Sequence, residues 1–269
     1  MARKLPANAT ILVPVRLPTV RGEQDLADVL VRSLVGMKLA LDTGDVLAVA
    51  SKIVSISEGA VVDLGRVKVT KQASRMARRW HLRPQLAAVV LGESETVVGG
   101  VRGFLLTVKN GMMTANAGVD LKNAPTGMAV CWPADADKTA ANLRRVLERE
   151  FRARLGVIIV DSRVTPMRLG TVGLAIGSSG IAAVRDYRGV RDLFGRTVRV
   201  TRSAVLDDLA SCAHLLMGEG RERTGAVVIC RAPVALDKRS VSRFAHLDMD
   251  QCLIASNLRA VSAAGQLRG

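Results

Sequence analysis

Hydrophobic and polar positions along the chain predict strands that alternate with amphipathic helices. The stretch ATILVPVRLPTV, residues 9–20, is typical of a strand that Pro18 ends. Residues 23–36 carry apolar side chains at helical spacing, and Gly36 supplies a stop signal. A strand is predicted directly after residues 43–45, and a further segment with β-branched residues follows it up to residue 64. The chain therefore opens with a strand, a helix and a second strand.

The middle of the chain carries the clearest local signals. Residues 70–92 are helical in composition, and Pro84 marks either a break or the start of a second helix. Asn110-Gly111 lies between two β-compatible arms, and this pair favours a two-residue type I′ hairpin. Residues 135–156 predict an amphipathic helix with Asp137 as candidate N-cap and Gly156 as its end. Its apolar stripe consists of Leu143, Val146, Leu147, Phe151 and Leu155.

The second half of the chain begins with a predicted strand at residues 157–160, which runs straight into Asp161 and Ser162. Glycine-rich residues 171–184 are expected to be extended, and residues 196–201 to form another strand. A helix is predicted over residues 203–217 and a strand over residues 225–232. The weakly patterned tail from residue 237 is expected to hold one short helix near residues 249–260.

Composition narrows the class of protein without identifying one. Hydrophobic residues make up 49% of the chain but aromatic residues only 3%, so the core must be built from Val, Leu, Ala and Ile. No apolar run reaches the roughly 20 residues that a membrane helix needs, and no segment of signal-peptide type follows the N-terminus. We therefore expect a cytoplasmic protein whose four cysteines, none in a C-x-x-C pair, are buried reduced thiols. The three histidines are scattered, so a zinc site of the Cys/His kind is not expected.

The charge of the chain favours anionic partners but does not select one. The formal net charge is +15, which suits nucleotides, phosphorylated metabolites or nucleic acid, or a basic surface that binds nothing specific. Residues 184–202 hold arginines with interleaved acids, either a solvated face with internal ion pairs or a set for carboxylate or phosphate recognition. The GSSG stretch at residues 177–180 lacks the G-x-x-x-x-G-K-[ST] pattern of a phosphate loop, so close packing or a turn is the preferred interpretation.

Three acidic residues lie at predicted loop ends beside glycine or small polar residues: Asp120, Asp161 and Glu219. Carboxylate and hydroxyl oxygens are the ligands that hard divalent cations prefer, and Mg²⁺ sites pair one or two carboxylates with phosphate oxygens. Asp161-Ser162 at a strand end follows that pattern. Acids at loop ends are also common as caps and turn residues, so the spacing leaves both interpretations open.

Five stretches of the chain occur in the order found in the coenzyme F-420 gamma-glutamyl ligase family, and the chain resembles that family over residues 9–232. They are GDVLAVASKIVSISEG, TANAGVDLKNAP, VIIVDSRVTPMRLGTVGLAIGSSGI, DYRGVRDLFGRTVRVT and DDLASCAHLLMGEG. The resemblance implies a ligase-like domain over residues 1–236 and a tail over residues 237–269. It implies an α/β (α+β) fold of two intertwined subdomains with mixed and antiparallel sheets, in a homodimer.

The resemblance also implies a reaction. GTP, with Mg²⁺ or Mn²⁺, drives amide formation between L-glutamate and the phospholactyl carboxylate of the deazaflavin cofactor precursor, through an acyl phosphate. No fused nitroreductase domain follows, so a bifunctional form is not expected. No membrane partner is implied, and a nucleic-acid partner is not expected, because nothing resembles a groove-reading helix or a stacking platform.

Matching positions imply roles for individual residues. The metal ligands would be Asp120, Asp161, Ser162 and Glu219. The nucleotide contacts would be Leu17, Pro18, Thr19, Val20, Ser51, Lys52, Asn123, Met217 and Gly218. Arg168 and Arg188 are candidate substrate contacts, and no catalytic residue is assigned.

The chain departs from the family near the expected nucleotide and acceptor. Ile56 stands where the family has a lysine near the nucleotide, and an alkyl group cannot replace a point charge beside phosphate. Residues 109–111 read KNG instead of Arg-His-Gly, and residues 163–168 read RVTPMR instead of Phe-Gly-Arg-Pro-(Trp/Phe)-Arg. These changes keep two further hypotheses open: a diverged ligase that acts on another acid and amine, and a nucleotide-binding protein without catalysis.

Overall fold

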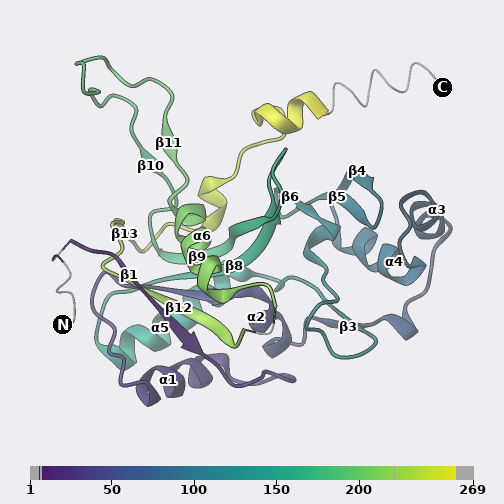
Figure 1. Cartoon of the computed structure of the whole chain (residues 1–269), viewed down its shortest axis with the longest axis horizontal. Coiled ribbons are helices and arrows are strands. Elements are labelled where there is room, and N and C mark those ends of the chain that lie inside the picture. Colours follow the sequence, from purple (N-terminus) through teal and green to yellow (C-terminus); the bar gives the residue numbers. More distant parts are fainter. Residues whose placement is uncertain (1–5, 7, 221, 259–269) are drawn as a thin grey trace. The chain divides into compact units, whose positions relative to one another are not determined.

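The chain divides into two compact units (Figure 1). The computed structural model describes residues 6, 8–220 and 222–258. Unit 1 consists of Met1–Gly59 and Pro133–Ala245, and unit 2 consists of Ala60–Trp132 and His246–Gly269. The chain thus leaves unit 1, builds most of unit 2 and then returns. Mixed α/β architecture with mixed and antiparallel sheets confirms the predicted fold class.

Unit 1 is built on a six-stranded sheet in the order β1-β12-β2-β8-β9-β13. Its strands are β1 (Ile11–Arg16), β12 (Thr224–Cys230), β2 (Val46–Ala50), β8 (Gly156–Val164), β9 (Thr171–Ile181) and β13 (Leu236–Asp237). All neighbours pair antiparallel except β2 and β8, which are parallel. The central strands are continuous apolar runs, as expected for strands whose two faces are both covered.

Helices cover both faces of this sheet. Figure 1 shows α6 (Val205–Met217) above the sheet, and α1 (Leu26–Gly36) and α5 (Ala136–Phe151) below it. The buried stripe of α6, with Leu206, Leu209 and Ala210, packs in one cluster with Ile158 of β8 and Val227 of β12. Helix α2 (Ser51–Ser57) follows β2 directly. The first part of the segment with β-branched residues expected after β2 is therefore a helix.

The N-cap predicted for α5 is wrong. Asp135 is the cap, because its carboxylate accepts a hydrogen bond from the Lys138 N–H at 2.8 Å. Asp137 lies in the first turn, where its Oδ1 accepts hydrogen bonds from the N–H groups of Ser178 (2.7 Å) and Ser242 (2.9 Å). Beside it, a Cβ at Gly177 would lie 2.4 Å from the backbone of α5, which confirms the close-packing interpretation of the GSSG stretch.

Two further elements of unit 1 differ from their predictions. α5 ends at Phe151 because Arg152 takes the left-handed conformation, and Gly156 begins β8 instead of ending the helix. Residues 196–201 do not form the predicted strand, apart from one bridge between Arg191 and Thr197. They belong to the arm, residues 185–203, whose base is the short pair β10 (Arg185–Asp186) and β11 (Arg202–Ser203). Almost all residues 196–201 are exposed, so their alternating valines have no core to face.

In its described first segment, Ala60–Trp132, unit 2 holds two small sheets and two α-helices. β4 (Thr96–Val101), β5 (Phe104–Lys109) and β6 (Met112–Ala115) form one sheet, and β3 (Val61–Asp63) pairs with β7 (Met128–Val130). Pro84 begins α4 (Pro84–Glu93) after α3 (Lys71–Trp80), so the second-helix alternative is correct. Asn110 and Gly111 both have positive φ, 50° and 71°, which confirms the tight hairpin. Short 3₁₀ turns lie at Leu64–Arg66 and Asn116–Gly118 here, and at Ser242–Ala245 in unit 1.

The remaining expectations concern the tail, the cysteines and the membrane. Residues 253–258 are helical, in agreement with the short helix predicted for the tail, whereas residues 259–260 lie outside the described residues. The domain boundary after residue 236 stays a prediction. All four cysteines are free thiols, but only Cys131 is buried. Cys230 and Cys252 are half-buried and Cys212 is exposed on α6, so the prediction of burial is wrong for these three. Within the described chain, no helix has the length and apolar content to span a bilayer.

Candidate functional site

Several strands of unit 1 finish at one end of its sheet, which we call the sheet end. The last residue of β1, Arg16, pairs with Thr224 at the start of β12. The last residue of β2, Ala50, pairs with Val160 of β8, directly before Asp161. The carboxyl ends of β1 and β2, the start of β12 and the second half of β8 therefore lie together. Crevices outside the carboxyl ends of strands are where open α/β sheets bind ligands.

The sheet end collects every predicted site residue of unit 1 except the two arginines. Residues 17–20 leave β1 there, and Ser51-Lys52 begin α2 immediately after β2. Asp161 and Ser162 continue β8 beyond its pairing with β2. Met217 ends α6, and Gly218 and Glu219 lead from it toward β12. Segments far apart in the sequence are thus brought to one edge of one unit.

The loop at residues 17–20 is packed firmly against its neighbours. The Leu17 N–H donates to the Arg223 carbonyl at 3.1 Å, and Leu17 is buried. A Cβ at Gly225 would lie 2.6 Å from Leu17 Cδ1 and 2.3 Å from Ile53 Cδ1, so β12 carries a glycine where the loop and α2 meet. Ile56 of α2 is only 7% exposed, so the residue that replaces the family's lysine packs in the interior.

Asp161 and Ser162 lie on β8, just after a register shift between Ile159 and Val160 in its pairing with β9. They pair with Leu174 and Gly173 of β9. A Cβ at Gly173 would lie 2.2 Å from the Ala210 carbonyl oxygen, so this glycine allows α6 to approach the strand pair closely. The next residue, Arg163, lies 3.7 Å from Asp207 of α6, and its buried Nε has no partner.

Glu219 is held by two donors from different elements. The Thr171 hydroxyl, at the start of β9, donates to Glu219 Oε1 at 2.8 Å. Nε2 of His214, in the last turn of α6, lies 2.9 Å from the same oxygen. The ring nitrogen is the donor, since a carboxylate can only accept. The sequence did not indicate Thr171 or His214 as site residues. The only available signal was the position of His214 in the last turn of a predicted helix, five residues before Glu219.

In unit 2, a left-handed turn precedes Asp120. Asn116, Ala117 and Gly118 all have positive φ, 51°, 53° and 72°. Such backbone costs roughly 1–2 kcal/mol for an ordinary residue, and buried hydrogen bonds hold it here. Asn116 Oδ1 accepts from the Leu105 N–H, and Thr107 Oγ1 accepts from the Ala117 N–H, each at 2.8 Å.

The turn delivers Asp120 to a short pairing. Its N–H and C=O exchange hydrogen bonds of 2.9 Å with Val130, and its Oδ1 accepts from the Lys122 N–H at 2.8 Å. Asn123 is exposed with a φ of 57°. Asp120 and Asn123 belong to unit 2, whereas Asp161, Ser162 and Glu219 belong to unit 1. The joint metal site therefore stays a prediction, and the nucleotide role of Asn123 does too.

The predicted acidic ligands are divided between the two units. Over the described parts of the chain, no group of three or more His, Cys, Asp or Glu residues is arranged to hold a metal ion. Two of the three predicted acidic ligands, Asp161 and Glu219, belong to unit 1, and Asp120 belongs to unit 2. A group of three acids is therefore not expected within unit 1. Asp161, Ser162 and Glu219 nevertheless offer the carboxylate and hydroxyl oxygens that suit a hard divalent cation.

The two predicted substrate arginines lie on connecting segments of unit 1. Arg168 is exposed in the turn between β8 and β9, where its N–H donates to the Thr165 carbonyl at 3.2 Å. Arg188 lies on the arm and forms an ion pair with Asp186 at 2.5 Å. Hydrogen bonds from Arg188 hold the pKa of the Asp186 carboxyl well below its usual range, and the pair raises the pKa of Arg188. The arm therefore holds an internal ion pair at Arg188, and the substrate contact of this arginine stays a prediction.

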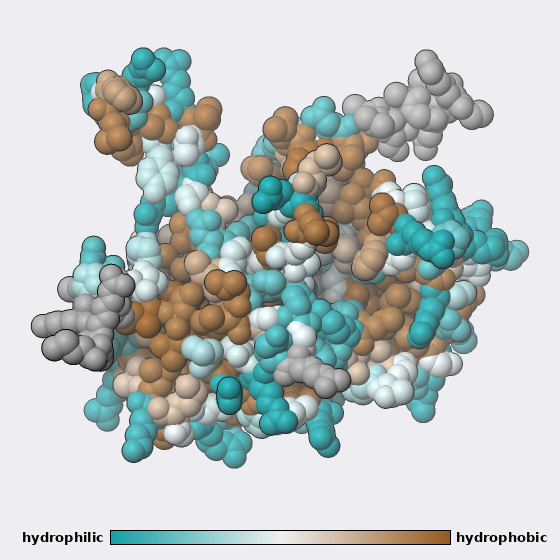
Figure 2. All heavy atoms as spheres, in the orientation of Figure 1, coloured by the Kyte–Doolittle hydropathy of each residue, from teal (hydrophilic) through white to brown (hydrophobic). Residues whose placement is uncertain are grey.

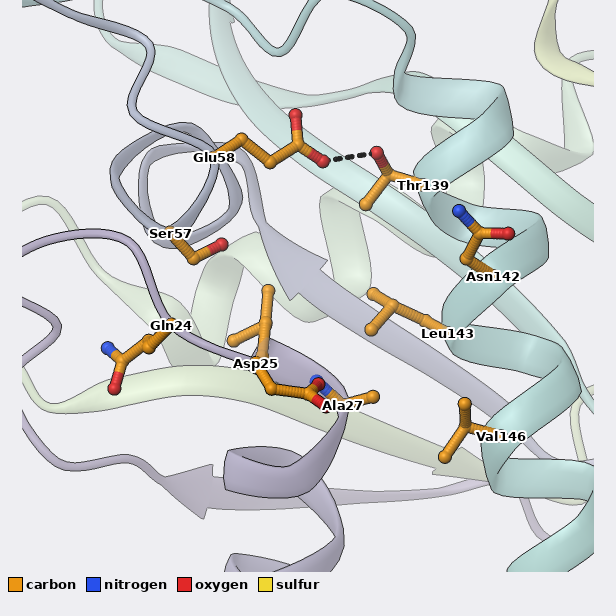
Figure 3. A pocket seen from close by; sticks show the side chains of 10 residues that line it. Gln24, Asp25, Ala27, Ser57, Glu58, Thr139, Asn142, Leu143 and Val146 are labelled. Carbon is orange, nitrogen blue, oxygen red and sulfur yellow. Dashed lines mark hydrogen bonds between the residues drawn. The ribbon is translucent and has the colours of Figure 1, made fainter.

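A separate pocket of about 270 Å³ lies among the start of α1, the end of α2 and α5 (Figure 3). Figure 3 shows Glu58 and Thr139 pointing toward each other, and the Thr139 hydroxyl donates to Glu58 Oε1. Among the described residues that line it there is no Lys or Arg and no predicted site residue. The pocket therefore does not suit a triphosphate.

Known proteins resemble this chain over most of its length. The family model of the F420-0:gamma-glutamyl ligases matches residues 14–231. The coenzyme F420:L-glutamate ligase of Methanopyrus kandleri is 42% identical over 78% of this chain and 81% of its own length. Those of Methanothermobacter thermautotrophicus and Archaeoglobus fulgidus are 36% and 37% identical, each over 79% of this chain and over 85% and 84% of their own lengths. The chain belongs to the F420-0:gamma-glutamyl ligase family.

Proposed function

We propose that this protein joins L-glutamate to the deazaflavin coenzyme F420 precursor in a reaction driven by GTP and a divalent metal. Family membership and relatives named coenzyme F420:L-glutamate ligase support the glutamate ligation. The observation that supports the use of GTP and a metal is the grouping of the predicted nucleotide and metal residues at the sheet end. Residues 17–20, Ser51-Lys52, Asp161-Ser162 and Met217–Glu219 converge there from four separate segments.

The proposed chemistry has two steps. The phospholactyl carboxylate attacks the γ-phosphate of GTP, which forms an acyl phosphate and releases GDP. The amino group of glutamate then attacks the acyl carbon, loses a proton and expels phosphate, so that an amide remains. A bound Mg²⁺ or Mn²⁺ would neutralise triphosphate charge. Asp161, Ser162 and Glu219 would hold it, while the packed loop at residues 17–20 and the start of α2 would position the nucleotide.

A product assay tests this proposal. The purified protein is incubated with the unglutamylated cofactor, glutamate, GTP and Mn²⁺, and glutamylated cofactor and GDP are quantified by chromatography with mass detection. We expect both products, and Asp161→Asn should lower their rate at least 100-fold because a metal ligand is lost. If neither GDP nor glutamylated product forms, the proposal is wrong.

A diverged ligase that acts on another acid and amine is the second candidate. Arg163, with its unpartnered buried Nε and its pairing to Asp207, stands in the segment that departs from the family. GDP release that requires a different acid, with the deazaflavin inactive, would favour this candidate. Strict dependence on the deazaflavin would remove it.

We also propose that the protein is a homodimer. The end of the arm carries exposed apolar side chains among polar ones, seen as brown spheres beside teal ones at the upper left of Figure 2. Leu193, Phe194 and Val200 are 101%, 86% and 83% exposed, and such a surface is better covered by a second copy. Light scattering after size exclusion should give the mass of a dimer, and Leu193→Ser with Phe194→Ser should give more monomer. A wild-type monomer at working concentration would contradict this.

A further inference from the structure

The carboxylate of Glu219 is anchored at a place where the chain has just left a helix. Gly218 follows α6, and its N–H donates to the His214 carbonyl at 3.0 Å. The ring of the same His214 donates to Glu219 Oε1 at 2.9 Å. One residue of the last helical turn therefore restrains both the backbone and the side chain of the segment that follows.

Thr171 restrains the same oxygen from the sheet. It is the first residue of β9 and pairs with Val164, two residues beyond Ser162 on β8. Its hydroxyl donates to Glu219 Oε1 at 2.8 Å. Two donors on one oxygen, from a helix and from a strand, fix the direction of a carboxylate that would otherwise choose among several rotamers.

We infer that Thr171 and His214 are positioning residues that aim the Glu219 carboxylate at a divalent cation bound at the sheet end. The inference rests on the proposed function, in which Glu219 is a metal ligand. Carboxylates that bind metals are themselves hydrogen-bonded, and loss of such outer partners typically weakens metal binding 10–100-fold. Neither Thr171 nor His214 needs to touch the metal or the substrates.

Metal binding alone provides the test. Mn²⁺ is titrated into the full chain without substrates, at one fixed pH, and free Mn²⁺ is followed by its electron paramagnetic resonance signal. Thr171→Val and His214→Phe remove the donors and should each raise the Kd for Mn²⁺ by about tenfold or more. Thr171→Ser and His214→Gln keep a donor and should stay within about threefold of wild type.

Thr139→Val is the matched control, because it removes a hydroxyl that also donates to a glutamate, in the separate pocket of unit 1. It should leave the Mn²⁺ Kd unchanged. The Tm of each variant is measured by thermal unfolding. If Thr171→Val or His214→Phe lowers the Tm while the Kd for Mn²⁺ stays at the wild-type value, the role of that residue is merely structural and the inference is overturned.

Two ligand variants separate this inference from the proposed function. If Asp161→Asn and Glu219→Gln weaken Mn²⁺ binding while Thr171→Val and His214→Phe do not, the positioning role is wrong and the metal site stands. If Asp161→Asn and Glu219→Gln bind Mn²⁺ as wild type does, the metal part of the proposed function is wrong. Weaker binding in all four variants, with recovery in Thr171→Ser and His214→Gln, supports both.

Discussion

Asp120 and Asp161 carry the same predicted role but are positioned by different means. Asp120 follows three consecutive residues with positive φ, which buried groups of Asn116 and Thr107 hold in place. Asp161 lies on β8 beyond its pairing with β2, where it pairs with Leu174 of β9. Unit 2 thus positions its acid with strained backbone, and unit 1 with ordinary strand pairing and helix packing.

The difference predicts different consequences of mutation. Strained backbone persists only where its surroundings over-determine it, so changes around the turn should cost folding free energy first. Asp161 and Ser162 do not have positive φ, so side-chain changes at these two positions should alter binding more than stability. Both tryptophans, Trp80 and Trp132, lie in unit 2, and fluorescence therefore reports on that unit alone.

The largest effect is expected for Gly118→Ala. The residue has a φ of 72°, and a Cβ there would lie 2.2 Å from Trp132 Nε1. Conformational strain and steric overlap together should lower the free energy of unfolding of unit 2 by about 3 kcal/mol or more. Guanidinium unfolding followed by tryptophan fluorescence measures it. Gly103→Ala, at a φ of 86° with open space around it, is the matched control and should cost about 1–2 kcal/mol.

Gly173→Ala tests how closely α6 must approach β9 in unit 1. Gly173 does not have positive φ, so the substitution adds no backbone strain. A Cβ there would lie 2.2 Å from the Ala210 carbonyl oxygen, so α6 must move away from the strand pair. We expect a loss of about 2 kcal/mol, measured by circular dichroism during unfolding. Gly99→Ala, in a strand of unit 2 with nothing near the new Cβ, should stay within about 0.5 kcal/mol of wild type. Equal effects of the two substitutions would contradict the role given to Gly173.

Thr107→Val removes one of the hydrogen bonds that hold the left-handed turn. Thr107 is fully buried and accepts from the Ala117 N–H, which the substitution leaves without a partner. The free energy of unfolding of unit 2 should fall by about 1–2 kcal/mol. Thr10→Val, which removes an exposed hydroxyl contact with the Arg231 carbonyl, should change stability by less than about 0.5 kcal/mol. A neutral Thr107→Val would show that the turn does not need this support.

The smallest effect concerns the thiol beside Trp132. Burial, and then the charge of Glu93, raise the pKa of Cys131 to about 11 from an ordinary value of 9.0. Between pH 9 and about 11, the folded state therefore keeps a proton that the unfolded state loses. The contribution of this thiol to the free energy of unfolding is complete below pH 9 and is lost as the pH rises to about 11. Cys131→Ala should flatten that fall in urea unfolding measured at several pH values. A steep fall that persists in Cys131→Ala would assign it to other groups.

Much of the fold could be predicted from local pattern. The strands β1, β2 and β8, the helix α1 and the hairpin at Asn110-Gly111 follow from hydrophobic spacing and turn residues within about a dozen positions. The left-handed turn at 116–118 could not be predicted, because Ala117 adopts it only through Thr107 and its neighbours. The strand expected at residues 196–201 is absent for a different reason. Its hydrophobic pattern is that of a strand, but the arm offers no buried surface against which the valines could pack.

The candidate site could be predicted only in part. Acids at loop ends and the family motifs indicate Asp161 and Glu219, because those residues lie inside recognisable stretches. Thr171 and His214 escaped notice, since their role depends on where the start of β9 meets the end of α6. Thr171 and His214 are 43 residues apart and meet only through Glu219, an arrangement that leaves no periodic trace in a sequence.

The position of β12 has a consequence for how the protein is made on the ribosome. β12 is the fifth of the six strands of this sheet to be synthesised, yet it lies between the first two, β1 and β2. β1 and β2 cannot join one sheet until residues 224–230 have emerged, whereas residues 60–132 of unit 2 form one continuous stretch. A nascent chain must therefore carry apolar, unpaired strands through most of its synthesis, and such edges are what chaperones bind.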